Sequence, residues 1–530
     1  MFRPLLLTVI LLLTACESEV GGDRQSGVSS NATHPADASI EWFDGTIAAA
    51  FEAAESEGKP LFLYWGAVWC PPCQEIKYTV FKSQEFIQLT RLFVPAYLDG
   101  DTEEAQAWGE KLGVMGYPTM IVFNPRGEEM TRIPGGIDIL RYNTVLELSL
   151  NQMRSTASLV QIALEDSTRL SADEFYQLAY YSWFQDTSAV PEDIDKTALF
   201  LGLSMSAPEG ELSNRFYMNY LLALAENNAS KDAGKDGLDA DLAIAKRLEK
   251  ILSSSSLILA SWDSLAYSME DILALPAIDD AHKAGLAALW ASSVFDLRFD
   301  ESLSKSEKLA GWLPRLQLAT RDDQRLAEDL QKLLRAELTS ADDATPDSFE
   351  RQSVIDQIGY IYREAGLVND AKALLLAELE KSASPYYFMS SLGSLAEKDE
   401  DFEQALDWRK SAYESSAGEA TRFQWGANYV LAMIRMAPED HQVIAGQASA
   451  LLSEFHVSGE LFAGRNFRTL KRLNENLRSW QEEQEPETLA FLSEIKRLCD
   501  DQKAASLQQQ SCRSLLVEDA LLAKKLVQAS

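Results

Sequence analysis

The sequence is poor in cysteine and histidine, and both shortages exclude classes of protein. Five cysteines among 530 residues are too few for a scaffold that is held together by disulfides. A zinc site needs ligands grouped at short spacing, whereas the histidines stand singly, at His34, His282, His441 and His456. We therefore expect no metal and no other cofactor, and we look for a specific role in each cysteine.

Basic side chains are also scarce. Lys and Arg total 48 against 81 Asp and Glu, which gives a net charge of −33. Because binding to phosphates requires positive charge, this balance excludes nucleic acid as a natural partner and disfavours acidic lipid surfaces. Acidic residues spread over helix surfaces keep a secreted protein soluble, and the other interpretation is that they steer basic partners.

Long hydrophobic runs are missing: no stretch approaches the roughly 18 uninterrupted apolar residues that a membrane-spanning helix needs. At the N-terminus, Arg3 precedes an apolar run from Leu5 to Leu13, and the small residue Ala15 stands before Cys16. This order is typical of a secretory signal and is too short to span a bilayer. We predict a signal peptide over residues 1–15.

The next segment, residues 16–38, consists mainly of Ser, Gly, Asp, Asn and Ala, with hardly any large apolar side chain. Such a composition cannot bury enough surface to fold. We predict a flexible tether here, which would let the first domain stand away from a membrane.

A dithiol motif is the most informative feature that is present. Trp69-Cys70-Pro71-Pro72-Cys73 follows the apolar run Leu61 to Trp65, and Tyr117-Pro118-Thr119 leads into another apolar run. A cysteine at the start of a helix lies over free backbone N–H groups, which favour the thiolate. A second cysteine three residues later lies one turn along, within reach of a mixed disulfide. The spacing therefore predicts dithiol exchange.

These residues resemble the thioredoxin superfamily, and the resemblance covers about residues 39–150. It implies that Cys70 is the attacking thiol, that Cys73 is the resolving thiol, and that Pro118 is a cis-proline whose preceding backbone pairs with the substrate. The same resemblance implies substrate-binding or supporting roles for the neighbouring residues Trp69, Pro71, Pro72 and Tyr117.

The chain departs from the thioredoxin pattern at two places. Tyr64 stands where thioredoxins usually carry a buried Asp, so proton handling at the resolving thiol is expected to differ. The dipeptide Pro71-Pro72 replaces Gly-Pro and resembles bacterial periplasmic thioredoxin-like reductases. Two alternatives for the cysteine pair are a structural disulfide, which would need neither the tryptophan nor the proline, and half of a zinc site.

The end of the signal, Leu13-Thr14-Ala15-Cys16, resembles the bacterial lipobox. The resemblance implies that Cys16 is lipidated and anchors the mature protein to a membrane of the bacterial cell envelope, facing the periplasm. Glu17 after the cysteine, rather than Asp, favours the outer membrane by the same analogy. An ordinary signal peptide with an incidental cysteine, or an uncleaved anchor, is the alternative.

Cys499 and Cys512 are the two cysteines not yet given a role. They bracket a polar stretch between two helical patterns, Leu489 to Leu498 and Ser514 to Val527. We predict a structural disulfide across this connection, which the loop-entropy model values at roughly 3 kcal/mol. Free thiols, or a second redox couple that exchanges with Cys70 and Cys73, are the alternatives.

Strand and helix patterns alternate over residues 39–151, as in an α/β domain. Asp101 is expected to cap a helix that runs to Leu112, and Asn124-Pro125-Arg126-Gly127 suits a tight hairpin turn. The other predicted elements are helices over 45–57, 71–81, 83–91 and 137–151, and strands over 61–65, 93–98, 119–123 and 128–133.

Beyond Met153 strand signals stop, and amphipathic helical patterns fill residues 152–530. Positions near 355–418 recur 34 residues apart: Gly359 and Gly393, Ala371 and Ala405, Val368 and Phe402, Leu374 and Trp408. This period, with small residues where paired helices touch, resembles tetratricopeptide repeats. Since stable stacks usually need three or more units, flanking helices are expected to be degenerate repeats. An unrelated helical bundle is the alternative.

The fold class predicted is thus an α/β thioredoxin-like domain followed by a large all-α, tetratricopeptide-like region. The leading hypothesis is an envelope thiol:disulfide oxidoreductase that reduces protein disulfides, receives electrons from a membrane or periplasmic dithiol donor, and recruits clients with its helices. We expect Cys70 to be solvent accessible and residues 39–151 to fold alone. The alternative is a membrane-tethered helical-repeat scaffold or adaptor whose thioredoxin-like domain is merely structural.

Overall fold

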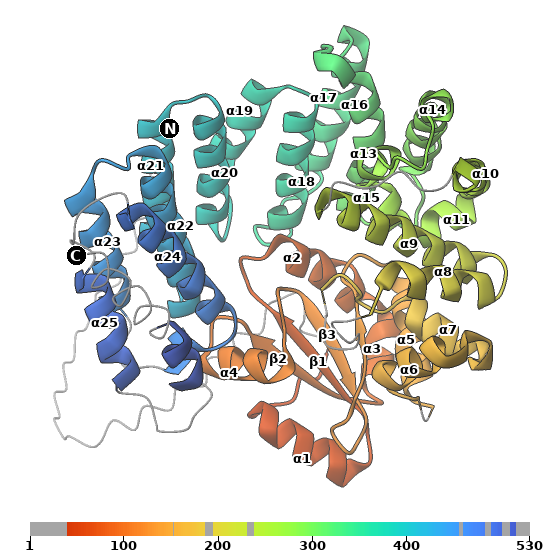
Figure 1. Cartoon of the computed structure of the whole chain (residues 1–530), viewed down its shortest axis with the longest axis horizontal. Helices are drawn as coiled ribbons and strands as arrows, with labels where there is room; N and C mark the ends of the chain where they lie inside the picture. Colours follow the sequence, from red (N-terminus) through yellow and green to blue (C-terminus); the bar gives the residue numbers. More distant parts are fainter. Residues whose placement is uncertain are drawn as a thin grey trace, which may run out of the picture.

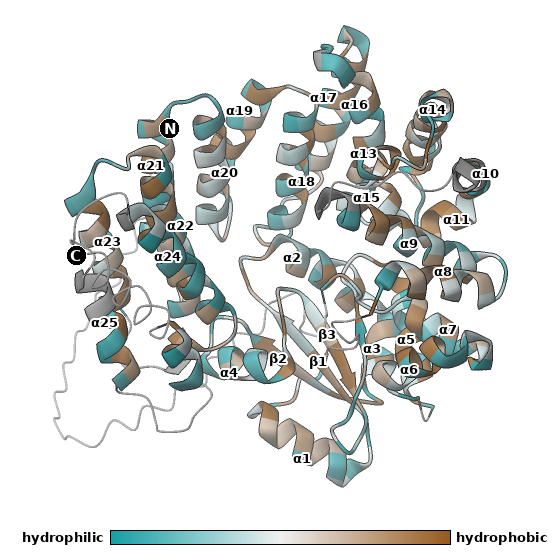
Figure 2. Ribbon diagram, in the orientation of Figure 1, coloured by the Kyte–Doolittle hydropathy of each residue, from teal (hydrophilic) through white to brown (hydrophobic). Residues whose placement is uncertain are grey.

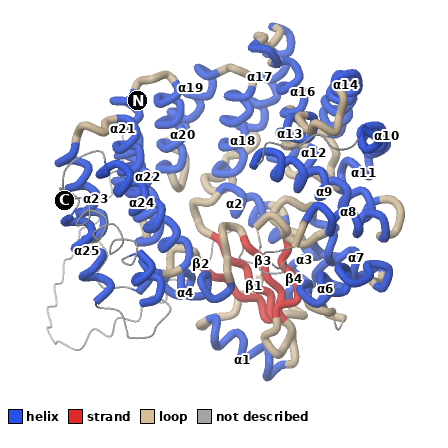
Figure 3. The backbone as a smooth tube through the Cα atoms, in the orientation of Figure 1, coloured by secondary structure: helices blue, strands red, loops and turns tan. Residues whose placement is uncertain are grey.

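A computed structural model of the chain describes residues 40–151, 153–185, 194–230, 238–454, 459–482, 489–500 and 509–515. The predicted signal peptide, the tether and Cys16 lie outside these ranges. The predicted fold class is confirmed: an α/β sheet domain comes first and a mostly helical region follows. Figure 3 shows that the strands are gathered in one small sheet, with helices around it.

The sheet has four strands in the order β2-β1-β3-β4. Their bounds are β1 (Leu61–Gly66), β2 (Val94–Asp99), β3 (Thr119–Phe123) and β4 (Glu129–Ile133). β1 pairs parallel with β2 and antiparallel with β3, and β3 pairs antiparallel with β4. Since β1 lies inside the sheet and all its residues are buried, it reads as a continuous apolar run. Figure 2 shows this concentration of apolar residues in the central strands.

Two separate cores cover the faces of the sheet. Alternate residues of β1 point to opposite faces, so Phe62 and Tyr64 enter one core while Leu61 and Trp65 enter the other. The flanking helices of this domain are α1 (Ile47–Glu57), α2 (Pro71–Tyr78), α3 (Gln84–Thr90), α4 (Glu103–Leu112) and α5 (Ile139–Ser149).

Two local predictions differ from the structure. The helix expected over 71–81 ends at Tyr78, and a short 3₁₀ turn, Val80–Lys82, follows it. The predicted cap at Asp101 is wrong, because Thr102 is the extended residue whose hydroxyl accepts from the Ala105 N–H at 3.3 Å. Both residue types cap helices well, so the sequence did not distinguish them. The Asp101 side chain instead accepts hydrogen bonds from Trp69 and Thr421.

One core of the sheet continues past residue 151. Phe62 and Tyr64 belong to the same buried cluster as Leu159, Phe175 and Phe216, which lie on the first helices of the helical region. These helices are α6 (Thr156–Asp166), α7 (Ala172–Ala179), α8 (Lys196–Ser206) and α9 (Glu211–Ser230). The boundary predicted at residue 151 therefore falls within a continuous hydrophobic core.

The remaining helices form an arch above the α/β domain (Figure 1). They are α10 (Leu238–Leu252), α11 (Ser255–Ala260), α12 (Trp262–Leu265), α13 (Met269–Leu273), α14 (Asp280–Leu297), α15 (Lys305–Ala310), α16 (Leu313–Ala319), α17 (Glu328–Asp343), α18 (Arg351–Glu364), α19 (Val368–Glu378), α20 (Pro385–Lys398), α21 (Phe402–Ser415), α22 (Glu419–Met436), α23 (His441–Ser453), α24 (Gly464–Glu482) and α25 (Leu489–Asp500). Within the ranges given above, no helix is both long and apolar enough to cross a bilayer.

The far end of the arch returns to the α/β domain. On α24, the N–H of Gly464 donates to Glu110 of α4 at 2.9 Å, and Arg468 donates to the Val114 carbonyl at 3.1 Å. In the middle of the arch, Tyr78 at the end of α2 donates to Asp347, which precedes α18. The arch therefore contacts the α/β domain at its far end and in the middle.

The predicted 34-residue spacing coincides with two helix pairs. α18 begins at residue 351 and α20 at 385, while α19 begins at 368 and α21 at 402. A Cβ on Gly359 would lie 3.4 Å from Leu375 of α19, and one on Gly393 would lie 3.3 Å from the Ala405 carbonyl of α21. Small residues thus stand where paired helices touch. Membership of the tetratricopeptide family stays a prediction.

Candidate active site

The two cysteines of the motif lie at the N-terminus of α2. Cys70 is the N-cap residue, and its Sγ accepts a hydrogen bond from the Cys73 N–H at 3.2 Å. Pro71 and Pro72 occupy the first turn, where a missing N–H leaves no helix bond unmade. The cysteines are joined as a disulfide, with their Cα atoms 5.2 Å apart. The pair is therefore placed where α2 would favour a Cys70 thiolate after reduction.

The proline loop lies beside this helix start. The Tyr117–Pro118 peptide bond is cis, and Thr119 begins β3 opposite Trp65, near the end of β1. Because β1 leads into the cysteine motif, this pairing brings the loop to the motif. Pro118 lines the same cavity as Pro71 and Pro72.

Trp69 is held by contacts from three parts of the chain. Its Nε1–H donates to Asp101 Oδ2 at 3.2 Å, and its ring packs edge-on against Tyr117 with centroids 5.9 Å apart. The guanidinium of Arg465, from the start of α24, lies 4.8 Å from the Trp69 ring centroid and 5.2 Å from that of Tyr117. A cation over an aromatic face is attracted by the ring quadrupole. The helical region thus helps to orient both aromatic residues.

Asp101 links the active-site tryptophan to the helical region. Besides Trp69, it accepts a hydrogen bond from the Thr421 hydroxyl on α22. Burial raises the pKa of Asp101 to about 6, against the lowering effects of the Thr421 bond and of Arg465. These roles of Asp101, Thr421 and Arg465 could not be predicted from the sequence. Asp101 was expected only as a helix cap, and no local pattern connects it to residues so far along the chain.

The cysteines are covered by helices. Cys70 is 3% exposed and Cys73 is 0% exposed. They share a small apolar cluster with residues of three helices: Tyr386, Tyr387 and Met389 of α20, Ala412 of α21, and Trp425 of α22. The expectation that Cys70 would be solvent accessible was therefore wrong. The covering residues lie more than 300 positions away in the sequence, so the motif itself carried no sign of them.

Aromatic residues occupy the place of the buried acid that thioredoxins usually carry. Tyr64 is fully buried and stacks on Tyr97, with ring centroids 5.5 Å apart. The ammonium of Lys77, also buried, lies 4.9 Å from the Tyr97 ring centroid. Burial raises the pKa of Asp99, while Lys77 lowers it. Position 64 thus carries no carboxyl, and the neighbouring Tyr97 ring lies beside the ammonium of Lys77, whose charge acts on Asp99.

Cys499 and Cys512 form a second disulfide, with Cα atoms 5.7 Å apart. Both side chains are buried in a core built from α22 to α25 and the segment after it, which also contains Ile495 and Leu515. This core is separate from the cluster around Cys70. The arrangement supports a structural role for the pair.

The arrangement at α2 can perform thiol–disulfide exchange. A Cys70 thiolate would attack one sulfur of a disulfide and release the other as a thiolate. Cys73 lies one turn away, within reach to displace the substrate from Cys70. In the part of the chain that the structure describes, no three His, Cys, Asp or Glu side chains are grouped to hold a metal ion.

Comparisons with known proteins agree with this geometry. Residues 47–149 match the family model described as thioredoxin-like domain. The chain is 32% identical over 93 residues to the thiol:disulfide interchange protein DsbD of Yersinia pestis (strain Pestoides F), which is 17% of this chain and 16% of that protein. It is 32% identical over 97 residues to the protein of the same name from Photorhabdus laumondii, 18% of this chain and 17% of that one. The chain therefore spans about a sixth of the length of the curated relatives it matches.

Proposed function

We propose that the protein is a thiol:disulfide oxidoreductase of the bacterial envelope, which reduces disulfides in client proteins through Cys70 and Cys73. The observation that carries the proposal is the position of Cys70 as N-cap of α2, beside the cis Tyr117–Pro118 bond. The thioredoxin-like domain and the similarity to thiol:disulfide interchange proteins support redox activity in general. The reducing direction rests on the resemblance of the Pro-Pro dipeptide to reductases.

The proposed reaction transfers two electrons per client disulfide. The Cys70 thiolate attacks one client sulfur, so that a Cys70–client bond forms and the second client sulfur leaves as a thiolate. Deprotonated Cys73 then attacks Cys70 Sγ, which forms the Cys70–Cys73 disulfide and releases the first client sulfur. The client takes up protons and leaves as a dithiol. A membrane or periplasmic dithiol donor reduces the protein and is itself oxidised.

The helical region is proposed to select clients. Since Tyr386 and Trp425 pack against the cysteine cluster, a client sulfur reaches Cys70 only when this cover opens. The covering helices belong to the region for which we propose tetratricopeptide-like repeats. Recognition and access would therefore be coupled, because a client that binds these helices could also hold the cover open.

We also propose that lipidated Cys16 tethers the protein to the envelope membrane, in the outer membrane by the lipobox analogy. Replacing Cys16 with Ser should then abolish acylation and release the protein from membranes, as measured by fractionation. Unchanged detergent-dependent fractionation of this variant would contradict the anchor.

A scaffold or adaptor is the second candidate, and the burial of both cysteines favours it. Insulin reduction with dithiothreitol as electron source separates the two. We expect the mature protein to reduce insulin and the Cys70→Ser/Cys73→Ser variant to be inactive. The Cys499→Ser/Cys512→Ser variant is the matched control and should retain activity. A folded mature protein without activity would favour the scaffold.

A further inference from the structure

A cavity of about 490 Å³ lies between the α/β domain and the arch. On one side it is lined by Pro71, Pro72 and Pro118 of the redox site, and on the other by residues of α12, α15 and α18. The volume falls within the range of roughly 300–1,000 Å³ that is typical of ligand pockets. Because the cavity begins at the cysteine motif, a group bound in it would lie beside the reacting disulfide.

The wall of this cavity is acidic. None of its lining residues is Lys, Arg or His, whereas six carry carboxyl groups: Glu75, Asp138, Asp263, Glu301, Glu307 and Asp356. Two of the six are neutralised from outside the cavity, since Asp138 pairs with Arg141 and Asp263 pairs with Arg215 at 2.8 Å. Among the described residues the other four make no ion pair.

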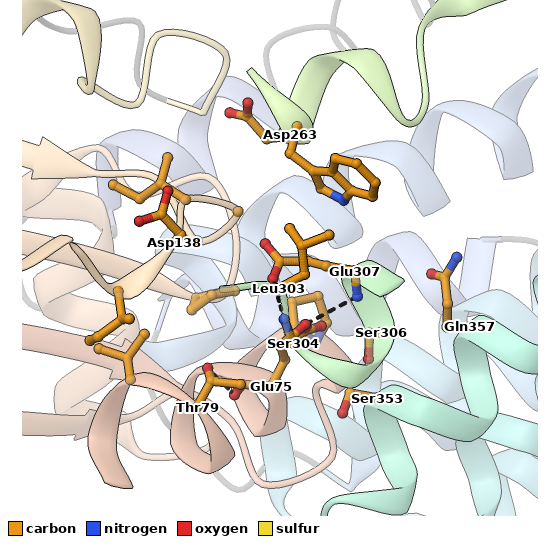
Figure 4. Close-up of a pocket in the computed structure, with 18 of the residues that line it drawn as sticks. Glu75, Thr79, Asp138, Asp263, Leu303, Ser304, Ser306, Glu307, Ser353 and Gln357 are labelled. Carbon is orange, nitrogen blue, oxygen red and sulfur yellow. Dashed lines mark hydrogen bonds between the residues drawn. The ribbon is translucent and has the colours of Figure 1, made fainter. Parts of the chain in front are cut away.

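The unpaired carboxyls come from separate elements and converge on the cavity. Figure 4 shows Glu75 of α2 and Glu307 of α15 on either side of Ser304, which is hydrogen-bonded to both. Burial raises the pKa of Glu75, and burial together with the nearby Glu75 raises the pKa of Glu307. Burial also raises the pKa of Asp356 to about 6, against the lowering effect of Arg363. A cation in the cavity would offset the free-energy cost of burying these carboxyl groups in their ionised form.

Unused hydrogen-bond donors point independently to a ligand. Trp262 of α12 lines the cavity and is 3% exposed, yet its indole Nε1–H has no partner among the residues that the structure describes. The buried Nε2 of Gln357 on α18, which lines the same cavity, is likewise without a described partner. Buried N–H donors normally find an acceptor, and backbone carbonyl oxygens of a peptide would supply it.

A second hollow extends the cavity along the arch. It measures about 440 Å³ and shares Asp356 and Gln357 with the first. Its other lining residues include one cation, Arg363, and the aromatic residues Tyr387 and Trp425, which also belong to the cover over Cys70. The two hollows thus adjoin each other beside the dithiol, which suits an extended chain better than a compact ligand.

We propose that this cavity binds a Lys- or Arg-bearing segment of the client polypeptide, with the cation among the carboxylates and a backbone carbonyl on Trp262. The inference rests on the proposed function and deepens it: the clients are basic around their disulfides. It also assigns part of the large acidic excess of the chain to substrate recognition.

The test compares disulfide-linked peptides that differ only in one residue near the cysteine: Lys, Gln or Glu. The reduced mature protein should reduce the Lys peptide with a kcat/KM at least about tenfold above that of the Glu peptide. Asp356→Asn combined with Glu301→Gln should remove most of this preference. Asp329→Asn combined with Asp280→Asn, an equal change of charge at two fully exposed sites on α17 and α14, is the matched control and should leave the preference unchanged.

Two further measurements separate this inference from the oxidoreductase proposal. Hydroxyethyl disulfide is small and neutral, so the unsubstituted protein and the Asp329→Asn/Asp280→Asn control should reduce it at the same rate, and failure of both would count against the redox activity alone. Peptides with Ser in place of Cys test binding without chemistry: calorimetry should show the Lys peptide binding about tenfold more tightly than the Glu peptide. Equal binding of the two, or a preference that survives Asp356→Asn/Glu301→Gln, would overturn the inference.

Discussion

Thr421 of α22 donates a hydrogen bond to Asp101, 320 positions earlier in the chain. The other oxygen of the same carboxylate accepts from Nε1 of Trp69, next to the first cysteine. The helical region is therefore connected through one carboxylate to the aromatic side chain that flanks Cys70. This contact makes the cover over the redox site a part of the site.

Thr421→Val should weaken the cover. The substitution removes one hydrogen bond from a buried carboxylate, which should lower the free energy of unfolding by about 1–3 kcal/mol. Urea denaturation measures this loss. Thr90→Val is the matched control, because that buried hydroxyl bonds within its own helix α3, to the Ile87 carbonyl at 2.8 Å. Equal losses in both variants would mean that the Thr421 contact stabilises nothing beyond α22.

Asp101 should make stability depend on pH. Its folded-state pKa of about 6 lies above the ordinary value of 3.8, so the folded state holds more protons than the unfolded state between these values. The free energy of unfolding should therefore fall as the pH rises from about 4 to about 6, by an amount on the order of 2 kcal/mol. Asp101→Asn should flatten this fall. Urea denaturation at a series of pH values checks it, and identical slopes for both proteins would contradict the assignment.

Removing the cover should expose the attacking thiol. Trp425→Ala takes away a large side chain that packs against the cluster around Cys70, so iodoacetamide should label reduced Cys70 several-fold faster. Cys73 should stay slow, because it is fully buried. Trp408→Ala, on α21 but packed against the main helical core, is the matched control. Predominant labelling at Cys73 would reverse the roles of the two thiols.

The shared core sets the smallest fragment that should fold. A fragment of residues 39–151 would expose the face on which Phe62 meets Leu159, Phe175 and Phe216. A fragment of residues 39–230 retains that core, and we expect a cooperative thermal transition from it and a weaker or absent one from the shorter fragment. Circular dichroism during heating measures both. If the shorter fragment is equally stable, the helices α6 to α9 are dispensable for the α/β domain.

The parts of the fold that could be predicted are those with local signals. β1 was visible as an apolar run, the cysteine spacing and the two prolines indicated the start of α2, and the 34-residue period located α18 to α21. The cover by Tyr386 and Trp425 could not be predicted, because no periodicity links them to Cys70. Asp101 was assigned to a helix cap for the same reason, since its true partner, Thr421, is remote.

The acidic cavity illustrates the same limit. In the sequence, Glu75 is an ordinary residue of an amphipathic helix. The structure shows that Glu307 of α15 lies near it. Each carboxyl alone is typical of a solvated helix face, and only their convergence between two regions of the chain makes them a recognition surface. The net charge indicated an excess of acid, but it contained no information about where that excess would gather.

The most direct test of the central claim is to trap the exchange intermediate. With Cys73→Ala, a client joined to Cys70 has no neighbouring thiol to release it. Non-reducing gels from cells should therefore show high-mass adducts that vanish with reductant, and mass spectrometry should find client peptides linked to Cys70. The Cys70→Ala/Cys73→Ala variant should form none. If a folded Cys73→Ala variant with reduced Cys70 forms no adducts, the protein does not exchange disulfides with clients.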